Sequence, residues 1–396
     1  MGVKHFTQPN EQFFSNNRYK IPSENEKRLL SSIFRSGNLS QPEIMKKAGI
    51  SQQSVSRLVK AFVKQGILYQ HHRKTTGRPG QPSINVALEP NFAFSLGVII
   101  HVHKVSVILM DLCGGVMTSA EHRIGIVSAE NYCYQIVALI EQLLRETDLD
   151  KNRLLGIGLG LPGYNASGIS GSQSTSEVIN NCIPNIANEL QNQLSTTVWV
   201  ESDVTTAALG ESLIGTGVKF RQFVYIHVGR QLSSRVIING LPLFGAYGNS
   251  GEIDLLLSQS NSYAPTVTSL YQSMCRNPTQ DTTPSPIQLD DFLAHFDDRR
   301  TGIADWIDHI LPCFSRIVSA LAAILDPEAI IIGGELPESV TRKLIASVQL
   351  FDDQPRLASR VKPQMLVSSS QYDTSAIGAA TIPLRQYFCD EQSVIV

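Results

Sequence analysis

The hydrophobic pattern of this 396-residue chain changes near residue 90, and the change divides the chain into two folding units. Before it, apolar residues recur every three or four positions, which is the spacing of amphipathic helices. After it, short apolar runs follow one another as strand, strand, strand and helix. With 42% hydrophobic residues the chain can fill more than one core, so we expect a small helical domain ahead of a larger α/β domain.

Basic and acidic residues are also distributed unevenly on the two sides of nearly the same point. Residues 1–82 hold 14 Lys and Arg against 4 Asp and Glu, whereas the remainder holds 19 against 31. A short basic run is usually a solvated surface, but here the excess spans a whole predicted domain. The head is therefore predicted to bind a polyanion, and double-stranded DNA fits that description.

The six cysteines are scattered along the chain and form no CxxC pair. Such spacing is typical neither of a disulfide framework nor of a zinc site, so no metal is expected. The N-terminus lacks the apolar core of a signal peptide, and no apolar run approaches the ~20 residues of a membrane span. We therefore expect a cytoplasmic protein without membrane insertion.

The first ninety residues predict an arm and three helices. Residues 1–22 show little periodicity and are expected to form a flexible arm, followed by a folded head at residues 23–90. Serines that can cap a helix open each one, and glycines close the first two: Ser23, Ser40, Ser51, Gly37 and Gly49. The short corner at residues 48–51 is typical of a helix-turn-helix, although three amphipathic helices are also a generic bundle.

The third predicted helix, residues 52–65, places its polar face where it could enter a major groove, since Gln and Arg can pair with base edges. The candidate DNA contacts on it are Gln52, Gln53, Ser54, Ser56, Arg57 and Lys60. A hairpin predicted at residues 67–88 forms a wing, with Arg73 near phosphates. Its Gly-Arg-Pro tip resembles an AT-hook and would place Arg78 in a narrow minor groove.

From residue 92 the succession of elements is that of the actin-like ATPase fold, in which two lobes enclose a ligand. Strands are predicted at residues 95–101, 105–112, 116–123, 155–160, 198–201, 224–228, 234–238 and 329–332. Helices are predicted at residues 129–146, from Val204 onward and at residues 306–325. We assign residues 91–396 to this two-lobed domain and expect it to sense an effector and to dimerise.

Several segments of the body resemble those of the ROK family, which contains bacterial sugar kinases and repressors of sugar genes. They are Gly156-Ile157-Gly158-Leu159-Gly160-Leu161-Pro162-Gly163, Glu201-Ser202-Asp203-Val204, Ile238-Asn239-Gly240, Gly248-Asn249-Ser250-Gly251-Glu252-Ile253 and Ile331-Ile332-Gly333-Gly334-Glu335. The resemblance implies that Asp203 matches the catalytic base of the kinases and that Glu252 matches a sugar-binding glutamate. Together with Ser202 they are the candidate effector contacts, and the winged head resembles that of the repressor branch.

The chain departs from the kinase pattern where ATP would be held. Kinases of the family place an Asp and a Gly-Gly-Thr turn after the first strand, whereas this chain has Gly97-Val98-Ile99-Ile100-His101-Val102-His103-Lys104. The second phosphate segment, normally rich in glycine, reads Gly229-Arg230-Gln231-Leu232-Ser233-Ser234-Arg235. Phosphoryl transfer depends on positioning and charge stabilisation, so these changes predict a protein that is not an enzyme and uses no cofactor.

The implied sugar and zinc contacts are also depleted. Leu255 replaces the family histidine, the later glutamate falls near Tyr271, and residues 258–265 replace the cysteine-rich zinc loop. Fewer groups remain to pair with sugar hydroxyls. Either the effector is not an ordinary hexose, or the site no longer binds a sugar and a protein partner supplies the signal.

The sequence as a whole predicts a DNA-binding transcriptional regulator, a repressor of carbohydrate-metabolism genes that binds a roughly palindromic operator as a homodimer or tetramer. Two alternatives stay open. One is an active ROK sugar kinase with an appended DNA-binding head. The other is an interaction protein that sequesters a transport component and binds DNA weakly.

Overall fold

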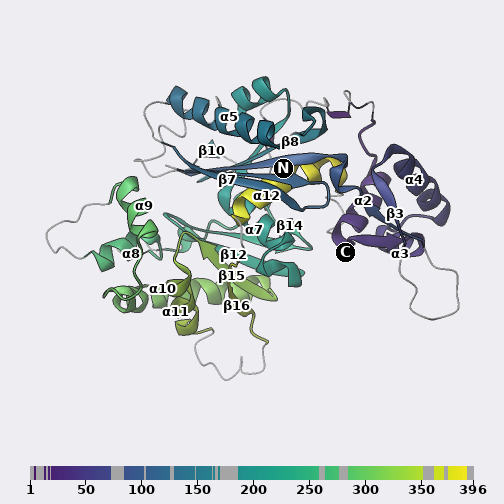
Figure 1. Cartoon of the computed structure of the whole chain (residues 1–396). Coiled ribbons are helices and arrows are strands. Elements are labelled where there is room, and N and C mark those ends of the chain that lie inside the picture. Colours follow the sequence, from purple (N-terminus) through teal and green to yellow (C-terminus); the bar gives the residue numbers. More distant parts are fainter. Residues whose placement is uncertain are drawn as a thin grey trace.

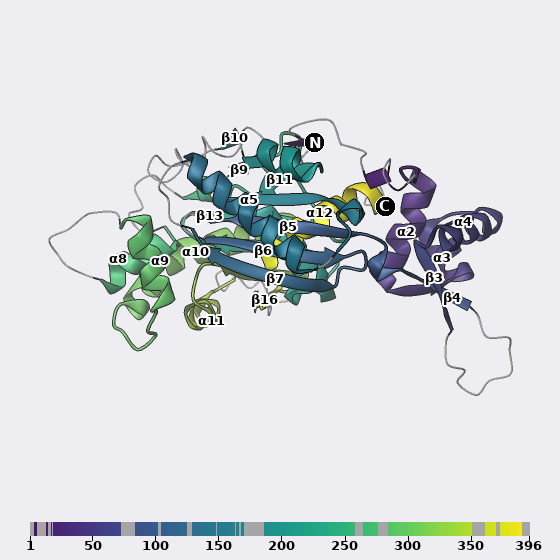
Figure 2. The ribbon, with the colours of Figure 1, turned by 45° about the horizontal axis from the view of Figure 1, so that its top comes forward.

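The computed structural model describes residues 4–5, 13–14, 17, 19–72, 84–101, 104–124, 129–147, 149–162, 164–165, 168–169, 186–257, 264–275, 284–350, 361–369 and 373–389. The head lies at one end of a larger body, which is built from two lobes (Figure 1). A second view keeps the head beside the lobe that contains β5 to β8, on the side where the C-terminal helix ends (Figure 2).

The head is a winged helix-turn-helix, as predicted. It comprises α2 (Glu24–Ser36), β2 (Asn38–Ser40), α3 (Gln41–Ala48), α4 (Gln52–Gln65), β3 (Leu68–His72) and β4 (Ile84–Leu88), with strand order β2-β4-β3. Ser23 and Ser40 form capping boxes, and the Ser51 hydroxyl accepts a hydrogen bond from the Ser54 amide. Gly49 and Gly66 end α3 and α4 in the left-handed conformation. The predicted N-caps Ser23, Ser40 and Ser51 and the end glycines Gly37 and Gly49 are confirmed.

Lobe 1 is a six-stranded mixed sheet with strand order β1-β11-β8-β5-β6-β7. Its strands are β1 (Lys4–His5), β5 (Phe94–Ile100), β6 (Lys104–Asp111), β7 (Val116–Arg123), β8 (Leu154–Leu161) and β11 (Val198–Ser202). The first three strands of the body form an antiparallel meander, and β8 and β11 run parallel to β5. Helix α5 (Ala129–Glu146) packs on the outer face, and the short strands β9 (Tyr164–Asn165) and β10 (Gly168–Ile169) pair with each other.

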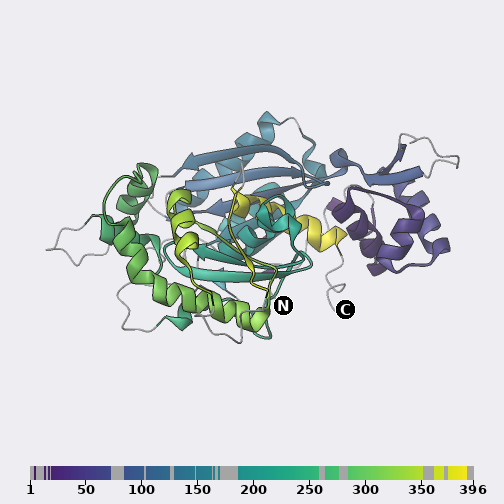
Figure 3. The same cartoon turned by 90° about the horizontal axis from the view of Figure 1, so that it is seen from below.

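Lobe 2 is a five-stranded sheet with strand order β14-β13-β12-β15-β16. Its strands are β12 (Gln222–Val228), β13 (Leu232–Ile238), β14 (Leu241–Pro242), β15 (Ala329–Gly334) and β16 (Gln364–Val367). Its helices are α8 (Val267–Met274), α9 (Pro286–Ala294), α10 (Ile303–Leu325) and α11 (Glu338–Ser347). Seen from below, α10 runs along the outer side of this lobe (Figure 3).

Helix α10 is, among the described helices, the one that is long and apolar enough to cross a membrane. Its apolar residues have another explanation within the fold. Trp306, Ile310 and Phe314 are fully buried in a cluster with strands of the lobe 2 sheet. The apolar character of α10 follows from its place in this core.

Two helices lie between the sheets and carry the contact between the lobes. Helix α7 (Asp203–Leu213) shares a core with the lobe 2 sheet, and α12 (Thr374–Phe388) shares one with the lobe 1 sheet. They meet backbone to backbone, because a Cβ on Gly378 would lie 1.7 Å from the Thr206 carbonyl oxygen and one on Gly210 would lie 1.9 Å from that of Thr374. Any side chain at either glycine would force α7 and α12 apart.

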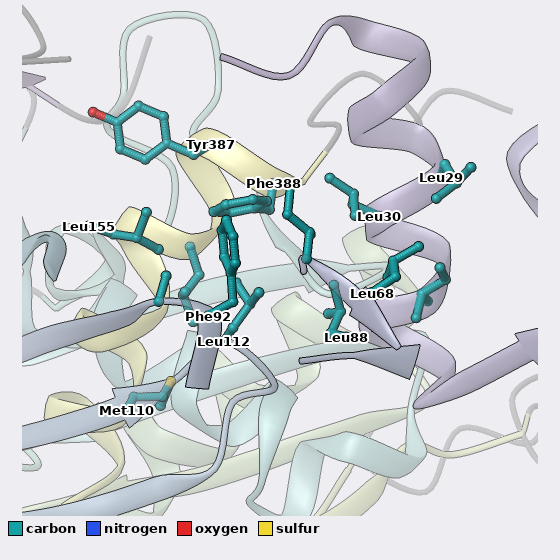
Figure 4. Close-up of a cluster of buried hydrophobic side chains, with 14 of the residues drawn as sticks. Leu29, Leu30, Leu68, Leu88, Phe92, Met110, Leu112, Leu155, Tyr387 and Phe388 are labelled. Carbon is teal, nitrogen blue, oxygen red and sulfur yellow. The ribbon is translucent and has the colours of Figure 1, made fainter. Parts of the chain in front are cut away.

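The head and lobe 1 share one continuous hydrophobic core. A single cluster joins Leu29 and Leu30 of α2, Leu68 and Leu88 of the wing strands, Met110 and Leu155 of lobe 1, and Tyr387 and Phe388 of α12. Figure 4 shows Phe92 and Phe388 between the leucines of the head and those of lobe 1. The head is therefore packed against the body through an apolar interface.

The prediction of a flexible arm is wrong for the described part of residues 1–22. Phe13 and Phe14 are each 4% exposed, and the Phe14 ring lies 4.9 Å from that of Tyr387. Further upstream, Lys4 and His5 pair with β11 and extend the lobe 1 sheet. The two phenylalanines provide the reason, since they bury apolar surface at the junction of head and body.

Candidate DNA-binding surface and inter-lobe site

Helix α4 divides into a buried and an exposed face as its sequence predicts. Val55, Leu58, Val59 and Phe62 are buried in the head. On the other face Gln52, Gln53, Arg57 and Lys60 are exposed, whereas Ser54 and Ser56 are half-buried. Arg57 and Lys60 are exposed cations, and among the described residues no carboxylate forms an ion pair with either.

The structure assigns Ser54 a local role. Its amide donates to the Ser51 hydroxyl over 3.4 Å, and the two hydroxyls lie 3.0 Å apart. Ser54 therefore belongs to the N-terminal cap of α4. The predicted wing contacts Arg73 and Arg78 lie outside the described residues.

The three candidate effector residues have different surroundings. Ser202 is 3% exposed and is the N-cap of α7, with its hydroxyl 2.6 Å from that of Thr205. Asp203 occupies the first position of α7 and is half-buried. Its Oδ1 accepts a hydrogen bond from the Val204 amide over 2.8 Å. Ser202 thus serves the fold, and Asp203 is the more accessible polar group.

Glu252 lies in lobe 2, immediately before the short helix η4 (Ile253–Leu256). It lines a pocket of about 330 Å³ together with Asn249, Ser250 and the leucines Leu321 and Leu325. Neither Ser202 nor Asp203 lines that pocket. This pocket therefore contains one of the three candidate effector residues, Glu252.

The turn that would hold phosphate in a kinase contains an internal ion pair. His101 follows β5, and its Nε2 lies 3.6 Å from Oδ2 of Asp373, the N-cap residue of α12. Burial alone would lower the pKa of His101, but the hydrogen bond and the negative charge of Asp373 outweigh it and raise that pKa. The same pairing holds the pKa of Asp373 below its usual value, although burial opposes this.

The second phosphate position is also occupied by protein charges. Arg230 Nη2 bonds to Asp290 of α9, and its Nε lies 3.7 Å from a carboxylate oxygen of Glu335. Glu335 directly follows β15, so this arginine ties the loop after β12 to two other parts of lobe 2. At both positions a side chain paired with carboxylates replaces a glycine-rich backbone.

Sequence reasoning missed two buried charges between the lobes, Glu201 and Arg235. Glu201 is 4% exposed in β11 and Arg235 is 6% exposed in β13. Burial raises the pKa of Glu201 to about 7, against the effects of the Ser202 amide and Arg235. Burial lowers the pKa of Arg235, against Glu201 and Glu252. The sequence did offer one indication of this pair, because Arg235 places a bulky cation at the end of a segment that is normally glycine-rich.

Comparisons with known proteins match both parts of the chain. A model of the ROK family matches residues 95–262, and a model of the MarR family matches residues 22–79. A protein from Sinorhizobium fredii, the uncharacterized protein y4fQ, is 25% identical over 92% of each chain. The xylose repressor of Bacillus spizizenii is 22% identical, over 59% of this chain and 60% of the repressor, so the match spans less than two thirds of that relative.

Solved structures show the same fold. A ROK family transcriptional regulator, a homolog of the Escherichia coli MLC protein, superposes with a TM-score of 0.66 at 16% identity, covering 92% of this chain and 98% of that one. A ROK family glucokinase from Streptomyces griseus superposes with a TM-score of 0.53 at 18% identity, covering 73% of this chain and 99% of the kinase. The regulator therefore matches head and body together.

A MarR-type winged head fused to a two-lobed body of the sugar-kinase fold defines a DNA-binding transcriptional regulator. The body carries a ROK family domain over residues 95–262, and the prediction made from its short motifs is confirmed.

Proposed function

We propose that this regulator represses carbohydrate-metabolism genes by binding a roughly palindromic operator as a homodimer or tetramer in the cytoplasm. The observation that carries the proposal is the exposed face of α4, where Gln52, Gln53 and Arg57 surround the start of the helix without an acidic partner among the described residues. Gln and Arg at the start of a recognition helix are suited to adenine and guanine edges. Ser56 lies between them, Lys60 is placed for a phosphate, and Arg73 and Arg78 are proposed wing contacts.

We further propose that the chain is not a kinase. The pairing of His101 with Asp373 and of Arg230 with Asp290 and Glu335 supports this, because both phosphate positions are committed to internal ion pairs. A bound triphosphate would have to break these pairs and would meet carboxylates in place of backbone amides. The alternative, a sugar kinase with an appended head, predicts ATP consumption when a sugar is offered.

The proposed signal is a carbohydrate-like effector, with Asp203 and Glu252 as contacts and Ser202 shaping the start of α7. The route to DNA is α12, because its N-cap Asp373 pairs with His101 between the lobes and its last turn packs against the head. A change in the relative position of the lobes would shift α12 and with it the head. A protein partner acting on the body is the second candidate signal.

Selection of bound sequences from a random duplex pool tests the proposal directly. The expected result is a symmetric consensus, with binding that weakens as salt rises. A coupled ATPase assay with a panel of sugars belongs to the same test, and no turnover is expected. Failure to enrich any sequence at low salt, or sugar-dependent ATP consumption, would contradict the proposed function.

A further inference from the structure

The described part of the chain ahead of α2 is attached to lobe 1. Strand β1 pairs antiparallel with β11 and so extends the lobe 1 sheet. Nearer the head, the side-chain amide of Asn17 donates over 2.7 Å to the backbone carbonyl of Asn152. Asn152 belongs to the short 3₁₀ helix η2 (Lys151–Arg153), which directly precedes β8. The chain therefore contacts the body before it enters the head.

Phe13 and Phe14 lie in the core that the head and the body share. Each side chain is 4% exposed, and both belong to the cluster that contains the leucines of α2. The Phe13 ring lies 6.0 Å from that of Phe92, and the Phe14 ring lies 4.9 Å from that of Tyr387 on α12. Both ring pairs meet edge to face, which is a favourable geometry for aromatic side chains. The two phenylalanines thus pack the segment ahead of the head against the body.

The same segment also reaches the recognition helix. The Tyr19 amide donates over 2.8 Å to the carbonyl of Phe14. The Tyr19 hydroxyl donates over 3.4 Å to the carbonyl of Gln65, the last residue of α4. The Tyr19 ring lies 5.0 Å from that of Phe92, just ahead of β5. Through Phe14 and Tyr19, the end of α4 is therefore connected to the edge of lobe 1.

The firmness of such an attachment matters to a protein that reads two half-sites at once. Heads held rigidly have a high effective concentration at one half-site spacing and a low one at others, whereas loosely attached heads accept several spacings with lower avidity. Half-sites one helical turn apart face the same side of the duplex, and a shift of about 5 bp turns one of them to the opposite side. Discrimination between spacings therefore reports how firmly the head is held.

We propose that Phe13 and Phe14 are positioning residues for operator recognition. They hold α4 in one orientation relative to lobe 1 and thereby set the half-site spacing that the regulator accepts. This role rests on the binding of a palindromic operator by two or more copies that is proposed above. Because both side chains are buried, they act through the placement of the head and not through contact with DNA. Their loss should leave the reading of a single half-site intact.

The test uses the full-length protein and variants of the segment. Phe14→Ala removes the ring that packs on Tyr387, and Phe14→Leu keeps an apolar side chain there. A chain that begins at Asn10 lacks β1 but keeps both phenylalanines. Tyr247→Ala is the matched control, because Tyr247 is an aromatic residue of lobe 2 that is 85% exposed.

Each protein is titrated by fluorescence anisotropy against three duplexes, with folding checked by circular dichroism. The duplexes are the selected operator, the same half-sites moved apart by about 5 bp, and a single half-site. The decisive quantity is the ratio of Kd between the shifted and the selected operator. A general loss of folded protein weakens binding to all three duplexes alike and leaves this ratio unchanged.

We expect the wild type and Tyr247→Ala to bind the shifted operator about tenfold more weakly or worse. In Phe14→Ala this ratio should fall to about threefold or less, with Kd for the single half-site within about twofold of the wild type. Phe14→Leu should restore most of the ratio. The chain that begins at Asn10 should also show a smaller ratio than the wild type, and it decides if Phe14→Ala fails to fold.

A folded Phe14→Ala, or in its place the shortened chain, that keeps the wild-type ratio would overturn the positioning role. A wild type that binds both spacings equally would overturn it as well. In either case the proposed function stands, because the operator has been selected. If selection yields no consensus sequence, the proposed function itself fails and the positioning role fails with it.

Discussion

Lys27 of the DNA-binding head donates a hydrogen bond from its Nζ to the backbone carbonyl of Gln386, 2.8 Å away near the end of α12. The same helix begins at Asp373, whose carboxylate pairs with His101 between the lobes. One helix of 15 residues therefore links the inter-lobe region to the base of α2. A helix of this length spans about 22 Å. Because α12 is one continuous helix, a displacement of its first turn would also displace the last turn, which contacts the head.

Shortening Phe388 should weaken the attachment of the head. Phe388 is 4% exposed within the cluster that joins α2, the wing strands and lobe 1. Phe388→Ala removes that buried ring and should cost about 3–5 kcal/mol. Urea denaturation followed by far-ultraviolet circular dichroism measures the loss. Tyr134→Ala is the control, because Tyr134 is 71% exposed on α5, and a comparable loss there would contradict the assignment.

Removing Arg57 should reduce sequence-specific binding more than general DNA affinity. A guanidinium that reads a base edge is worth about 1–3 kcal/mol on the cognate site and much less on random DNA. Fluorescence anisotropy on the selected operator and on a scrambled duplex separates the two effects in Arg57→Ala. Lys64→Ala, an exposed cation in the last turn of α4, is the matched control. Equal losses of Arg57→Ala on both duplexes would rule out base reading.

The pair His101–Asp373 should make stability depend on pH. The folded-state pKa of His101 is raised, so its contribution is fully present below about pH 6.5 and is lost as pH rises through the higher folded value. The folded-state pKa of Asp373 is lowered, so its contribution is present above about pH 4 and is lost as pH falls.

The contribution of this pair is therefore greatest between about pH 4 and about pH 6.5. Thermal denaturation across pH 4 to 9 should show that His101→Gln loses stability inside this window and less outside it. A uniform loss at every pH would mean that His101 acts through packing rather than through its charge.

Glu201, unlike the pair His101–Asp373, should lower the stability of the folded protein near neutral pH. Burial raises its folded-state pKa from 4.5 to about 7, so the folded protein disfavours the carboxylate, and stability falls as pH rises through this interval. In Glu201→Gln the fall should be smaller by an amount on the order of a few kcal/mol. Urea midpoints at pH 5 and pH 8 give the comparison. If the urea midpoint falls by the same amount between pH 5 and pH 8 in Glu201→Gln as in the wild type, the pKa of Glu201 is not raised in the folded protein.

The sequence predicted the head and most of the strands because their signals are local. Caps such as Ser40 and Ser51 and the helical spacing of Val55, Leu58 and Val59 depend on neighbours within one or two turns. Helix α12 was not predicted, since it is buried on most sides and rich in small residues, so it has no polar face to set a helical period.

The site was predictable in composition but not in arrangement. The motifs identified Asp203 and Glu252, yet only the fold shows that Ser202 caps α7 and that Glu252 lines a pocket without Asp203. His101 pairs with Asp373, and Arg230 pairs with Glu335. Both partners are distant in the sequence and come close only when the sheets form. Contacts of this kind depend on long-range packing, which one sequence does not reveal.

Because the head shares its core with the body, the body fixes the orientation in which each recognition helix is presented. In an assembly of two copies, the bodies would then determine the separation between the two recognition helices, and with it the spacing of the operator half-sites. The base sequence of each half-site would then depend on α4, and the distance between the half-sites would depend on the bodies.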